Sequence, residues 1–316
     1  MIIVTASDNN FVPGLFLFIF SAWIHNREAK FVVIDAGIEL AAVIELRLFC
    51  ERKGIDCQIV QADAKRISDL PTRGKLLTTA AYARILIPEL LPDCDKAIYM
   101  DADTLVVSDL GGLWSADLGD NLVAGVIDGF VEQEELDDIE MPRNDYINSG
   151  VLTMNLVAWR RDGIADRIFA KVRETAKSRY LDQTALNAVV RGRVIFLGRE
   201  WNFFSDRYVE IERRLPKVIH YAGSAKPWRY RRVPFADVFN FYRTMSGLDI
   251  PEGTLILKSA RRRKMILGLM GLRRKYWSSA LATYYYRRRF TKPHLRRLGK
   301  MFLKVPLPQQ HSTAAP

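Results

Sequence analysis

Two carboxylates with one residue between them directly follow an apolar run, and this pair is the strongest chemical signal in the sequence. Residues 97–100 lead straight into Asp101, Ala102 and Asp103. Residues i and i+2 of an extended backbone point to the same side, so we expect both carboxylates to reach one cation. Carboxylate oxygens suit Mg²⁺ or Mn²⁺, which are often shared with substrate phosphates. Two solvated acids at the end of a strand are the simpler alternative, because an isolated pair of this kind often arises by chance.

A second polar segment follows another short apolar run and contains His220, Gly223 and Lys226. An imidazole added to two carboxylates shifts the preference of a site towards Mn²⁺. Glycine allows the backbone to approach a phosphate closely, and lysine supplies a point charge for it. Taken alone, His220 is more simply explained as a hydrogen-bonded residue of the core or the surface.

Residues 101–105 also fit the phosphatases of the haloacid dehalogenase superfamily, in which the first aspartate is a nucleophile. Those enzymes usually carry the motif near the start of the chain, and they need a later helix-borne lysine and a second acidic pair after a strand. Here about a hundred residues come first, and no paired aspartates follow a downstream strand at the expected place. A phosphatase is therefore the less favoured interpretation.

The elements that must position these residues alternate along the chain, which predicts an α/β fold. Short apolar runs rich in β-branched residues predict buried strands of a mainly parallel sheet with right-handed crossovers. These runs lie at residues 2–4, 31–34, 59–60, 97–99, 123–127, 194–196 and 218–219. Helical patterns cover residues 11–24, 38–53, 78–91 and 156–177. Ligands of such sheets usually bind at the carboxyl ends of the strands.

Two of the predicted helices carry a more specific expectation. The pattern over 38–53 places its apolar residues on one face and ends at Gly54, a common residue just past a helix C-terminus. The residues of that face are Leu40, Val43, Ile44 and Leu48. Residues 11–24 are too few to span a bilayer, and no Lys or Arg precedes them, so we expect a buried helix rather than a signal peptide. The protein is accordingly expected to be cytoplasmic.

Composition and charge set further limits. The 316 residues are 49% hydrophobic and 26% charged, which excludes disorder, collagen and coiled coil as the main architecture. The three cysteines form no C-x-x-C pair, so neither a disulfide framework nor a zinc site is expected. The net charge of +11 comes entirely from residues 253–316, which hold 16 Lys and Arg and no acid. Such a tail points to an anionic partner, either a membrane or a nucleic acid.

Taken together, the motifs resemble those of glycosyltransferase family 8, retaining enzymes that use nucleotide-sugar donors on a GT-A fold. Within that family the chain is most similar to bacterial lipopolysaccharide and lipooligosaccharide galactosyl- and glucosyltransferases. The resemblance covers about residues 1–230. It implies that Asp101, Asp103 and His220 hold Mn²⁺, with Mg²⁺ as the second choice. It also implies that Gly223 and Lys226 contact the pyrophosphate of a UDP-sugar.

The same resemblance assigns the remaining donor contacts and the reaction centre. It places uridine and ribose against Ala6, Asp8 and Asn10, and it brings Arg84 and Asn148 to the donor sugar. Ala102 is counted with the donor site because it lies inside the acidic motif. The residues expected to act in catalysis are Asp128, Asp182, Gln183 and Lys226. Many relatives have a further aspartate where this chain has Thr184, so any role of that acid is absent here.

An amide oxygen is a weak nucleophile, so the presence of Gln183 at the reaction centre favours attack from the leaving-group face over a double displacement. We therefore expect a retaining α-glycosyltransferase that moves a hexose from a UDP-sugar to a saccharide hydroxyl, with galactose first and glucose second. Lipopolysaccharide or another surface glycan is the expected product. A non-catalytic glycan- or lipid-binding protein with a relic donor site is the alternative, and the phosphatase stands third.

The resemblance also bears on the tail, whose basic runs are interleaved with aromatic residues such as Trp277 and Phe290. An acceptor built on a membrane lipid would need the enzyme at the inner face of the membrane. An interfacial segment with aromatic rings at headgroup level fits that need, so an anionic membrane is favoured and nucleic acid is not. The chain is accordingly divided into a catalytic GT-A domain over 1–250, a membrane-associating amphipathic tail over 251–305 and a frayed end over 306–316.

Overall fold

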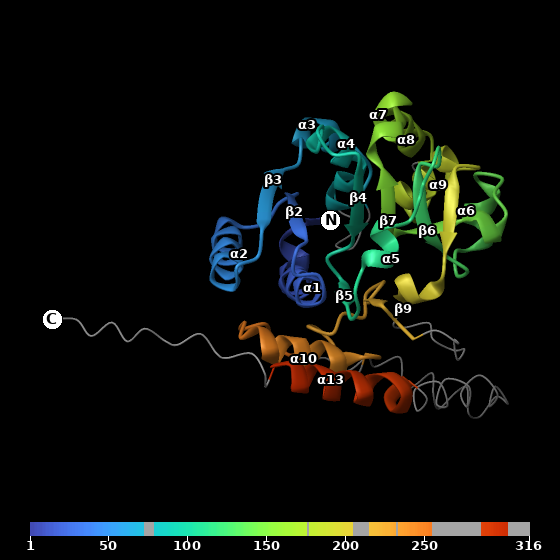
Figure 1. The fold of residues 1–316 in the computed structure, drawn as a ribbon. Coiled ribbons are helices and arrows are strands. Elements are labelled where there is room, and N and C mark those ends of the chain that lie inside the picture. Colours follow the sequence, from blue (N-terminus) through green and yellow to red (C-terminus); the bar gives the residue numbers. More distant parts are fainter. Residues whose placement is uncertain (73–78, 176, 205–214, 232, 255–285, 303–316) are drawn as a thin grey trace.

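A twisted seven-stranded sheet forms the centre of the computed structural model, which describes residues 1–72, 79–175, 177–204, 215–231, 233–254 and 286–302 (Figure 1). The strands are β1 (Ile2–Ser7), β2 (Lys30–Asp35), β3 (Cys57–Gln61), β4 (Lys96–Met100), β6 (Val123–Ile127), β7 (Ile147–Asn155) and β8 (Val194–Leu197). Their order is β3-β2-β1-β4-β7-β6-β8. All neighbours pair in parallel except β7, which runs antiparallel to both β4 and β6. The mainly parallel sheet predicted from the apolar runs is confirmed.

A small second sheet begins directly after the acidic motif, which ends at Asp103. It consists of β5 (Thr104–Val106), β10 (Val218–His220) and β9 (Phe203–Phe204), in the order β5-β10-β9. Strands β5 and β10 are antiparallel, and their register sets His220 opposite Thr104. Because Thr104 follows Asp103 directly, this register brings the histidine beside the acidic pair from more than a hundred residues away.

Helices cover both faces of the large sheet. The α-helices are α1 (Val12–His25), α2 (Leu40–Lys53), α3 (Ala64–Ile67), α4 (Ile87–Leu90), α5 (Gly111–Trp114), α6 (Gln133–Asp137), α7 (Leu156–Arg161), α8 (Ile164–Glu174), α9 (Leu181–Val190), α10 (Ala236–Ser246) and α13 (Lys292–Phe302). Short 3-10 and π segments are η1 (Asn9–Phe11), η2 (Thr79–Leu86), η3 (Arg143–Asp145), η4 (Arg199–Trp201) and η5 (Arg287–Thr291). Side chains alternate between the faces of a strand, so Ile3 of β1 packs with residues of α1 and α2, whereas Val4 packs with residues of η2, α7, α8 and α9.

The buried helix predicted over 11–24 is confirmed as α1. It has Pro13 in its first turn, where the missing N–H costs no hydrogen bond. Gly14 lies against the acidic loop: a Cβ there would stand 2.5 Å from the carbonyl oxygen of Ala102 and 2.7 Å from the Trp228 ring. Only a glycine therefore lets α1 approach the loop that carries the two carboxylates.

Three helix predictions need correction. Gly54 ends α2 in the left-handed conformation as expected, but the buried residues of α2 are Val43, Leu46, Phe49 and Cys50. The other three members of the predicted face, Leu40, Ile44 and Leu48, are among the exposed hydrophobic residues. The pattern over 78–91 is mostly the 3-10 segment η2 followed by one turn of α4. The pattern over 156–177 is two helices, because Gly163 adopts a φ of 59° between α7 and α8.

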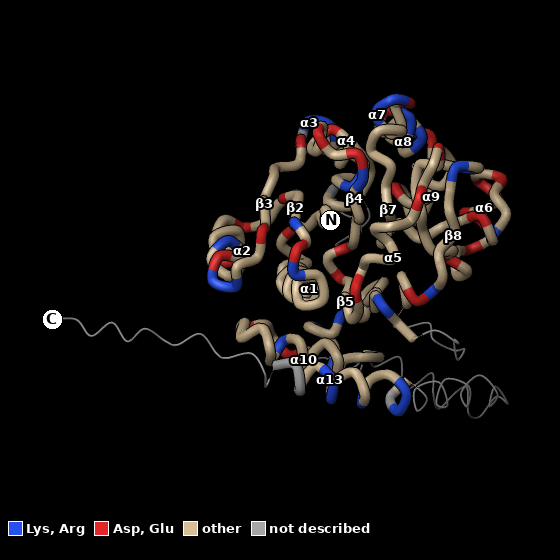
Figure 2. Tube along the Cα trace, viewed as in Figure 1, with Lys and Arg blue, Asp and Glu red and all other residues tan. Residues whose placement is uncertain are grey.

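The described part of the tail packs on the body through one face. Tyr286, Phe290, His294 and Leu298, spaced four residues apart, are all buried. His294 contacts α10 through a hydrogen bond of 3.1 Å between its Nε2 and the hydroxyl of Tyr242. Lys292, Arg296 and Arg297 of α13 are exposed, and Figure 2 marks in blue the basic positions along this helix. Residues 255–285 and 306–316 lie outside the described residues, so the tail and frayed-end boundaries stay predictions. No helix among the described residues is long and apolar enough to cross a membrane.

Candidate active site

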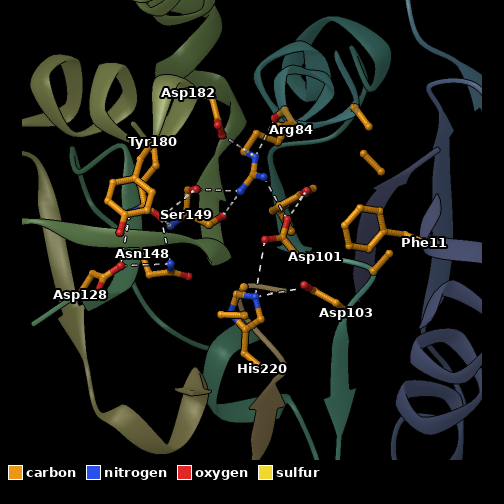
Figure 3. Close-up of a pocket in the computed structure, with 18 of the residues that line it drawn as sticks. Phe11, Arg84, Asp101, Asp103, Asp128, Asn148, Ser149, Tyr180, Asp182 and His220 are labelled. Carbon is orange, nitrogen blue, oxygen red and sulfur yellow. Dashed lines mark hydrogen bonds and ion pairs between the residues drawn. The ribbon is translucent and has the colours of Figure 1, made fainter. Parts of the chain in front are cut away.

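A cavity of about 790 Å³ opens at one edge of the large sheet (Figure 3). The parallel strands β1, β4 and β6 all end at this edge, and the antiparallel β7 begins there. Residues from all four strand ends therefore reach one space, among them Ala6, Asp101, Asp128 and Asn148. The expected location of a ligand at the carboxyl ends of the strands is thus matched by an actual cavity.

Asp101, Asp103 and His220 form a group whose ligand atoms all lie within 4.8 Å of one another. His220 Nε2 stands 3.9 Å from Asp101 Oδ2 and 3.2 Å from Asp103 Oδ1. The carboxylates face the same cavity, but not because of an extended strand: the motif is a turn in which the N–H and the hydroxyl of Thr104 both donate to the Asp101 carbonyl. The two carboxylates therefore share one site as predicted, but a turn rather than an extended strand brings them together.

The donor set fits a divalent cation. Asp103 Oδ1 is buried and accepts no hydrogen bond from the described residues, which leaves lone pairs for a metal ion. Asn202 Nδ2 donates to Asn148 Oδ1 at 2.8 Å, so Asn202 Oδ1 is left to accept from His220 Nδ1, also at 2.8 Å. This bond fixes the tautomer in which His220 Nε2 carries the lone pair and faces both carboxylates. Two carboxylates and one imidazole suit Mn²⁺.

Gly150 of β7 forms the floor of this group. A Cβ at this position would stand 2.4 Å from His220 Cε1 and 2.6 Å from Asp101 Oδ2. The Gly150 carbonyl accepts a hydrogen bond of 2.8 Å from the N–H of Asp101, so the strand cannot retreat from the motif. The absence of a side chain is therefore a condition for the close approach of the histidine and the carboxylate.

Arg84 lies behind the metal group and joins it to the start of α9. Its guanidinium is buried, with Nη2 at 3.1 Å from Asp101 Oδ1 and Nε at 3.3 Å from Asp182 Oδ2. It also donates to the carbonyl and the hydroxyl of Ser149 at 2.6 and 2.9 Å. The Tyr99 hydroxyl donates to the same Asp101 oxygen at 2.7 Å, which directs the other oxygen, Oδ2, towards His220. Arg84 thus holds two acids apart and in place, with its donors occupied by protein groups.

The acids of the cavity differ in their protonation. Burial raises the pKa of Asp182 to about 6, although Arg84 acts in the opposite direction. Burial would also raise the pKa of Asp103, but the Lys226 ammonium holds it well below its usual range. Lys226 is itself buried, and its Nζ donates to Asp103 Oδ2 and to the Tyr221 carbonyl. Asp103 is therefore an ionised ligand whose charge is offset by a lysine.

Gln183 of α9 lines the cavity beside Asp128 and Asn148. Its carbonyl oxygen accepts from Asn148 Nδ2 at 2.9 Å and from the Ser149 N–H at 3.1 Å. Its amide nitrogen donates to Asp128 Oδ2 at 3.3 Å. The side chain that was expected at the reaction centre therefore has a defined orientation, with its carbonyl oxygen already engaged.

The donor residues expected from the sequence are only partly brought together. Ala6, Ala102 and Gly223 line the cavity, and Gly223 has a φ of 78°, a conformation that favours glycine. Asp8 and Asn10 are not among the residues that line it. Asp8 caps η1 instead, accepting from the backbone N–H of Asn10 at 2.8 Å and from its side chain at 3.2 Å. A contact of those two residues with a nucleoside stays a prediction.

Several residues of the site carry no recognisable sequence signal. Asn202 and Tyr99 orient His220 and Asp101, and neither belongs to the acidic pair or to the segment from His220 to Lys226. The cavity is also lined by Phe11, Ser149, Arg179, Tyr180, Phe204 and Ser224. Tyr180 lies two residues before Asp182 and Ser149 directly follows Asn148, so proximity in sequence was the one available indication for those two.

Comparison with known proteins gives a consistent result. A sequence profile described as glycosyl transferase family 8 matches residues 2–232. General stress protein A of Bacillus subtilis is 27% identical over 268 residues, which are 77% of this chain and 92% of that protein. The lipopolysaccharide 1,2-glucosyltransferase of Escherichia coli is 24% identical over 240 residues, 70% of each chain. The crystal structure of the galactosyltransferase LgtC with donor and acceptor sugar analogues has a TM-score of 0.70 at 28% identity, covering 83% of this chain and 100% of that one.

Proposed function

The chain belongs to glycosyltransferase family 8 and has a GT-A type α/β fold, and from this premise we propose that it transfers a hexose from a UDP-sugar to a saccharide hydroxyl with retention of configuration. A nucleotide-sugar donor and a sugar acceptor follow from the family, and the phosphatase alternative loses its support. The observation that carries the proposal is the convergence of Asp101, Asp103, His220 and Lys226 on one cavity at the sheet edge. A relic site has no need to keep two carboxyl groups, an oriented imidazole and a buried lysine together.

We infer that Asp101, Asp103 and His220 hold Mn²⁺, with Mg²⁺ as the second choice. Once bound there, such an ion neutralises charge on the diphosphate leaving group and acts as a Lewis acid. The chain's own contribution is orientation: Tyr99 and Arg84 fix Asp101 Oδ1, and Asn202 fixes the imidazole. Lys226 supplies a second positive charge at the same place, which stabilises the growing negative charge on the diphosphate.

The reaction forms a bond between the acceptor oxygen and the anomeric carbon, while the bond from that carbon to the phosphate oxygen breaks. We propose that the acceptor proton passes to the departing phosphate, so that attack occurs on the face of the leaving group. Gln183 steadies the positive charge at the sugar through its oriented amide dipole. Asp128 and Asp182 orient hydroxyl groups of the sugar, and Arg84 holds Asp182 in place for this. The support is the position of these side chains on one cavity wall.

Galactose is the first choice for the sugar and glucose the second. LgtC is described as a galactosyltransferase, and the Escherichia coli relative as a lipopolysaccharide glucosyltransferase. The two hexoses differ in the configuration of one hydroxyl, so a single hydrogen bond decides between them. We propose lipopolysaccharide or another surface glycan as the acceptor, on the strength of those relatives.

The tail favours an anionic membrane surface as a further partner. Arg288, Arg289, Lys292, Arg296 and Arg297 are all exposed on one short segment whose apolar face is already packed on the body. Basic side chains near anionic lipid contribute about 1 kcal/mol each. Binding should therefore be electrostatic: sedimentation with phosphatidylglycerol vesicles should be lost at high salt, and binding that survives salt would contradict this interpretation.

The test of the proposed function is UDP release by the purified protein from a panel of UDP-sugars, with Mn²⁺ and with EDTA. We expect slow hydrolysis of UDP-galactose, or of UDP-glucose, that EDTA abolishes. Release that is independent of metal, or no release from any UDP-sugar, would overturn the proposal.

A further inference from the structure

Gln183 is held at both ends of its amide, and the holding groups on the nitrogen side form a chain that reaches α6. On the oxygen side, Asn148 and Ser149 donate to Oε1. On the nitrogen side, Nε2 stands 3.3 Å from Asp128 Oδ2 and 3.4 Å from the hydroxyl oxygen of Tyr146. Asp128 is a cavity residue, whereas Tyr146 is fully buried behind it.

The Tyr146 hydroxyl continues the chain to Thr184 and Glu135. Its oxygen is 2.9 Å from Thr184 Oγ1, and Thr184 Oγ1 donates to Glu135 Oε2 at 2.7 Å. Glu135 is buried although it stands in the acidic segment of α6. Its carboxylate accepts additional hydrogen bonds from the Ser178 hydroxyl and the Arg179 N–H. No Lys or Arg side chain is paired with it among the described contacts, so hydrogen bonds hold this acid.

The direction of each hydrogen bond in this chain follows from the inventory of donors. A hydroxyl has one hydrogen, and Thr184 gives its hydrogen to the Glu135 carboxylate. Thr184 has no second hydrogen for Tyr146, so in the hydrogen bond between the two hydroxyls Tyr146 is the donor and Thr184 is the acceptor. Burial raises the pKa of Tyr146 above its usual range, so the phenol keeps its proton to donate. With that proton used, the Tyr146 oxygen is an acceptor and fits the NH₂ end of Gln183.

We propose that Thr184 and Tyr146 are positioning residues that carry the acceptor character of the Glu135 carboxylate to Gln183 and thereby help to hold its amide in a fixed orientation at the reaction centre. The inference rests on the proposed function, in which Gln183 stands at the reaction centre. If the relay is cut at Thr184, the Tyr146 hydrogen loses its acceptor. The phenol can then turn its hydrogen towards Gln183 Nε2, which removes one acceptor from the nitrogen side of the amide. The amide is then held less firmly in the orientation that Asn148 and Ser149 set from its oxygen side.

The backbone beside Gln183 shows why such support is needed. Leu181, two residues before it, has a φ of 33°, a left-handed conformation that residues other than glycine rarely adopt. Glu135 holds the preceding turn through Ser178 and Arg179 and the first turn of α9 through Thr184. One carboxylate thus supports both sides of the strained residue.

The test compares Thr184→Val, which keeps the shape and removes the hydroxyl, with Thr184→Ser, which keeps the hydroxyl. We expect Thr184→Val to lower kcat for UDP-sugar hydrolysis by about 10- to 100-fold with little change in donor KM, because misplacing a reacting group costs this much. Thr184→Ser should recover most of the rate. The matched control is Thr153→Val on β7, which removes another fully buried hydroxyl, one that donates to the Leu113 carbonyl of α5. This control should lower the melting temperature but not kcat.

A second variant separates positioning from stability. Tyr146→Phe combined with Thr184→Val should be no slower than the slower single variant, because both cut one chain. If the rate losses of the two single variants multiply in the double variant, the relay is overturned. A Thr184→Val enzyme with wild-type kcat would overturn it as well. Gln183→Ala distinguishes the two levels of the proposal: if it does not slow the reaction, the proposed role of Gln183 fails. If it slows the reaction and Thr184→Val does not, only the relay fails.

Discussion

Gly150→Ala is the substitution for which the structure gives the sharpest expectation. Its new Cβ would stand 2.4 Å from His220 Cε1, 2.6 Å from Asp101 Oδ2 and 3.0 Å from Asn148 Oδ1. Ordinary contacts begin near 3.4 Å, so the imidazole must retreat by about 1 Å. Strand β7 cannot move away instead, because the Gly150 carbonyl accepts a hydrogen bond from the Asp101 N–H. The methyl group therefore enters the space where two metal ligands meet.

The magnitude follows from what such a displacement does to a metal site. Disturbing even the partners that orient metal ligands typically costs 10- to 100-fold in affinity, about 1.4 to 2.8 kcal/mol. Overpacking a core costs a similar amount of folding free energy, about 1 to 3 kcal/mol. We expect both effects, so the protein should remain folded at room temperature while its Kd for Mn²⁺ rises at least about tenfold.

The assay is a titration followed by the electron paramagnetic resonance signal of free Mn²⁺, with UDP present. Gly125→Ala is the control, because its Cβ would stand 2.8 Å from Ile147 Cδ1 and 3.2 Å from Leu152 Cδ2, the flexible ends of apolar side chains. It should lower the melting temperature and leave Mn²⁺ binding unchanged. Equal Mn²⁺ affinity in Gly150→Ala and the wild type would refute the assignment of the metal to this group.

Three other predictions test separate parts of the site and the fold. Lys226→Met should tighten Mn²⁺ binding in the absence of nucleotide and weaken UDP binding, because Asp103 loses its lysine partner; a loss of both affinities in calorimetry would contradict it. Asp182 is protonated more readily when folded, with a pKa of about 6, so its contribution to stability should fall by about 3 kcal/mol as pH rises from about 4 to 6 and then level. Asp182→Asn should remove this pH dependence from the free energy of unfolding measured by denaturant titration, and an unchanged pH dependence would contradict the explanation. Burial lowers the pKa of His25 to about 4 and of His294 to about 3, so unfolding takes up protons at these two residues and their contribution to stability should drop as pH falls from about 6.5 to 4. The opposing slope of Asp182 is separated from theirs by comparing each variant with the wild type; a His294→Asn variant with the same acid dependence of melting as the wild type would argue against this.

Much of the fold was predictable because it rests on local patterns. The apolar runs identified the strands of the large sheet apart from β7, and α1 and the end of α2 at Gly54 were also foreseen. The buried face of α2 was not predicted, because apolar residues lie on both sides of this helix. Packing against the body buries Val43 and leaves Leu40 and Ile44 exposed. The break at Gly163 was missed, because a single glycine within a periodic pattern does not reveal its φ.

The convergence of Asp101, Asp103 and His220 was predicted from the sequence, whereas the backbone that brings them together was not. Residue types and order pointed to Asp101, Asp103 and His220, but the turn that aims the carboxylates and the β5–β10 register that delivers the histidine are tertiary features. The roles of Asn202 and Glu135 could not be predicted from the sequence for the same reason. Each acts through hydrogen bonds to residues far away in sequence, and nothing in the local sequence marks such a partner.

The most direct test of sugar transfer with retention is proton NMR of UDP-galactose and UDP-glucose hydrolysis followed from the first turnovers. With Mn²⁺ and wild-type protein, we predict that UDP and the α-anomer of the free sugar appear first, before mutarotation produces the β-anomer. Asp103→Asn should release neither. Initial formation of the β-anomer would contradict retention, and release by Asp103→Asn at the wild-type rate would contradict the site.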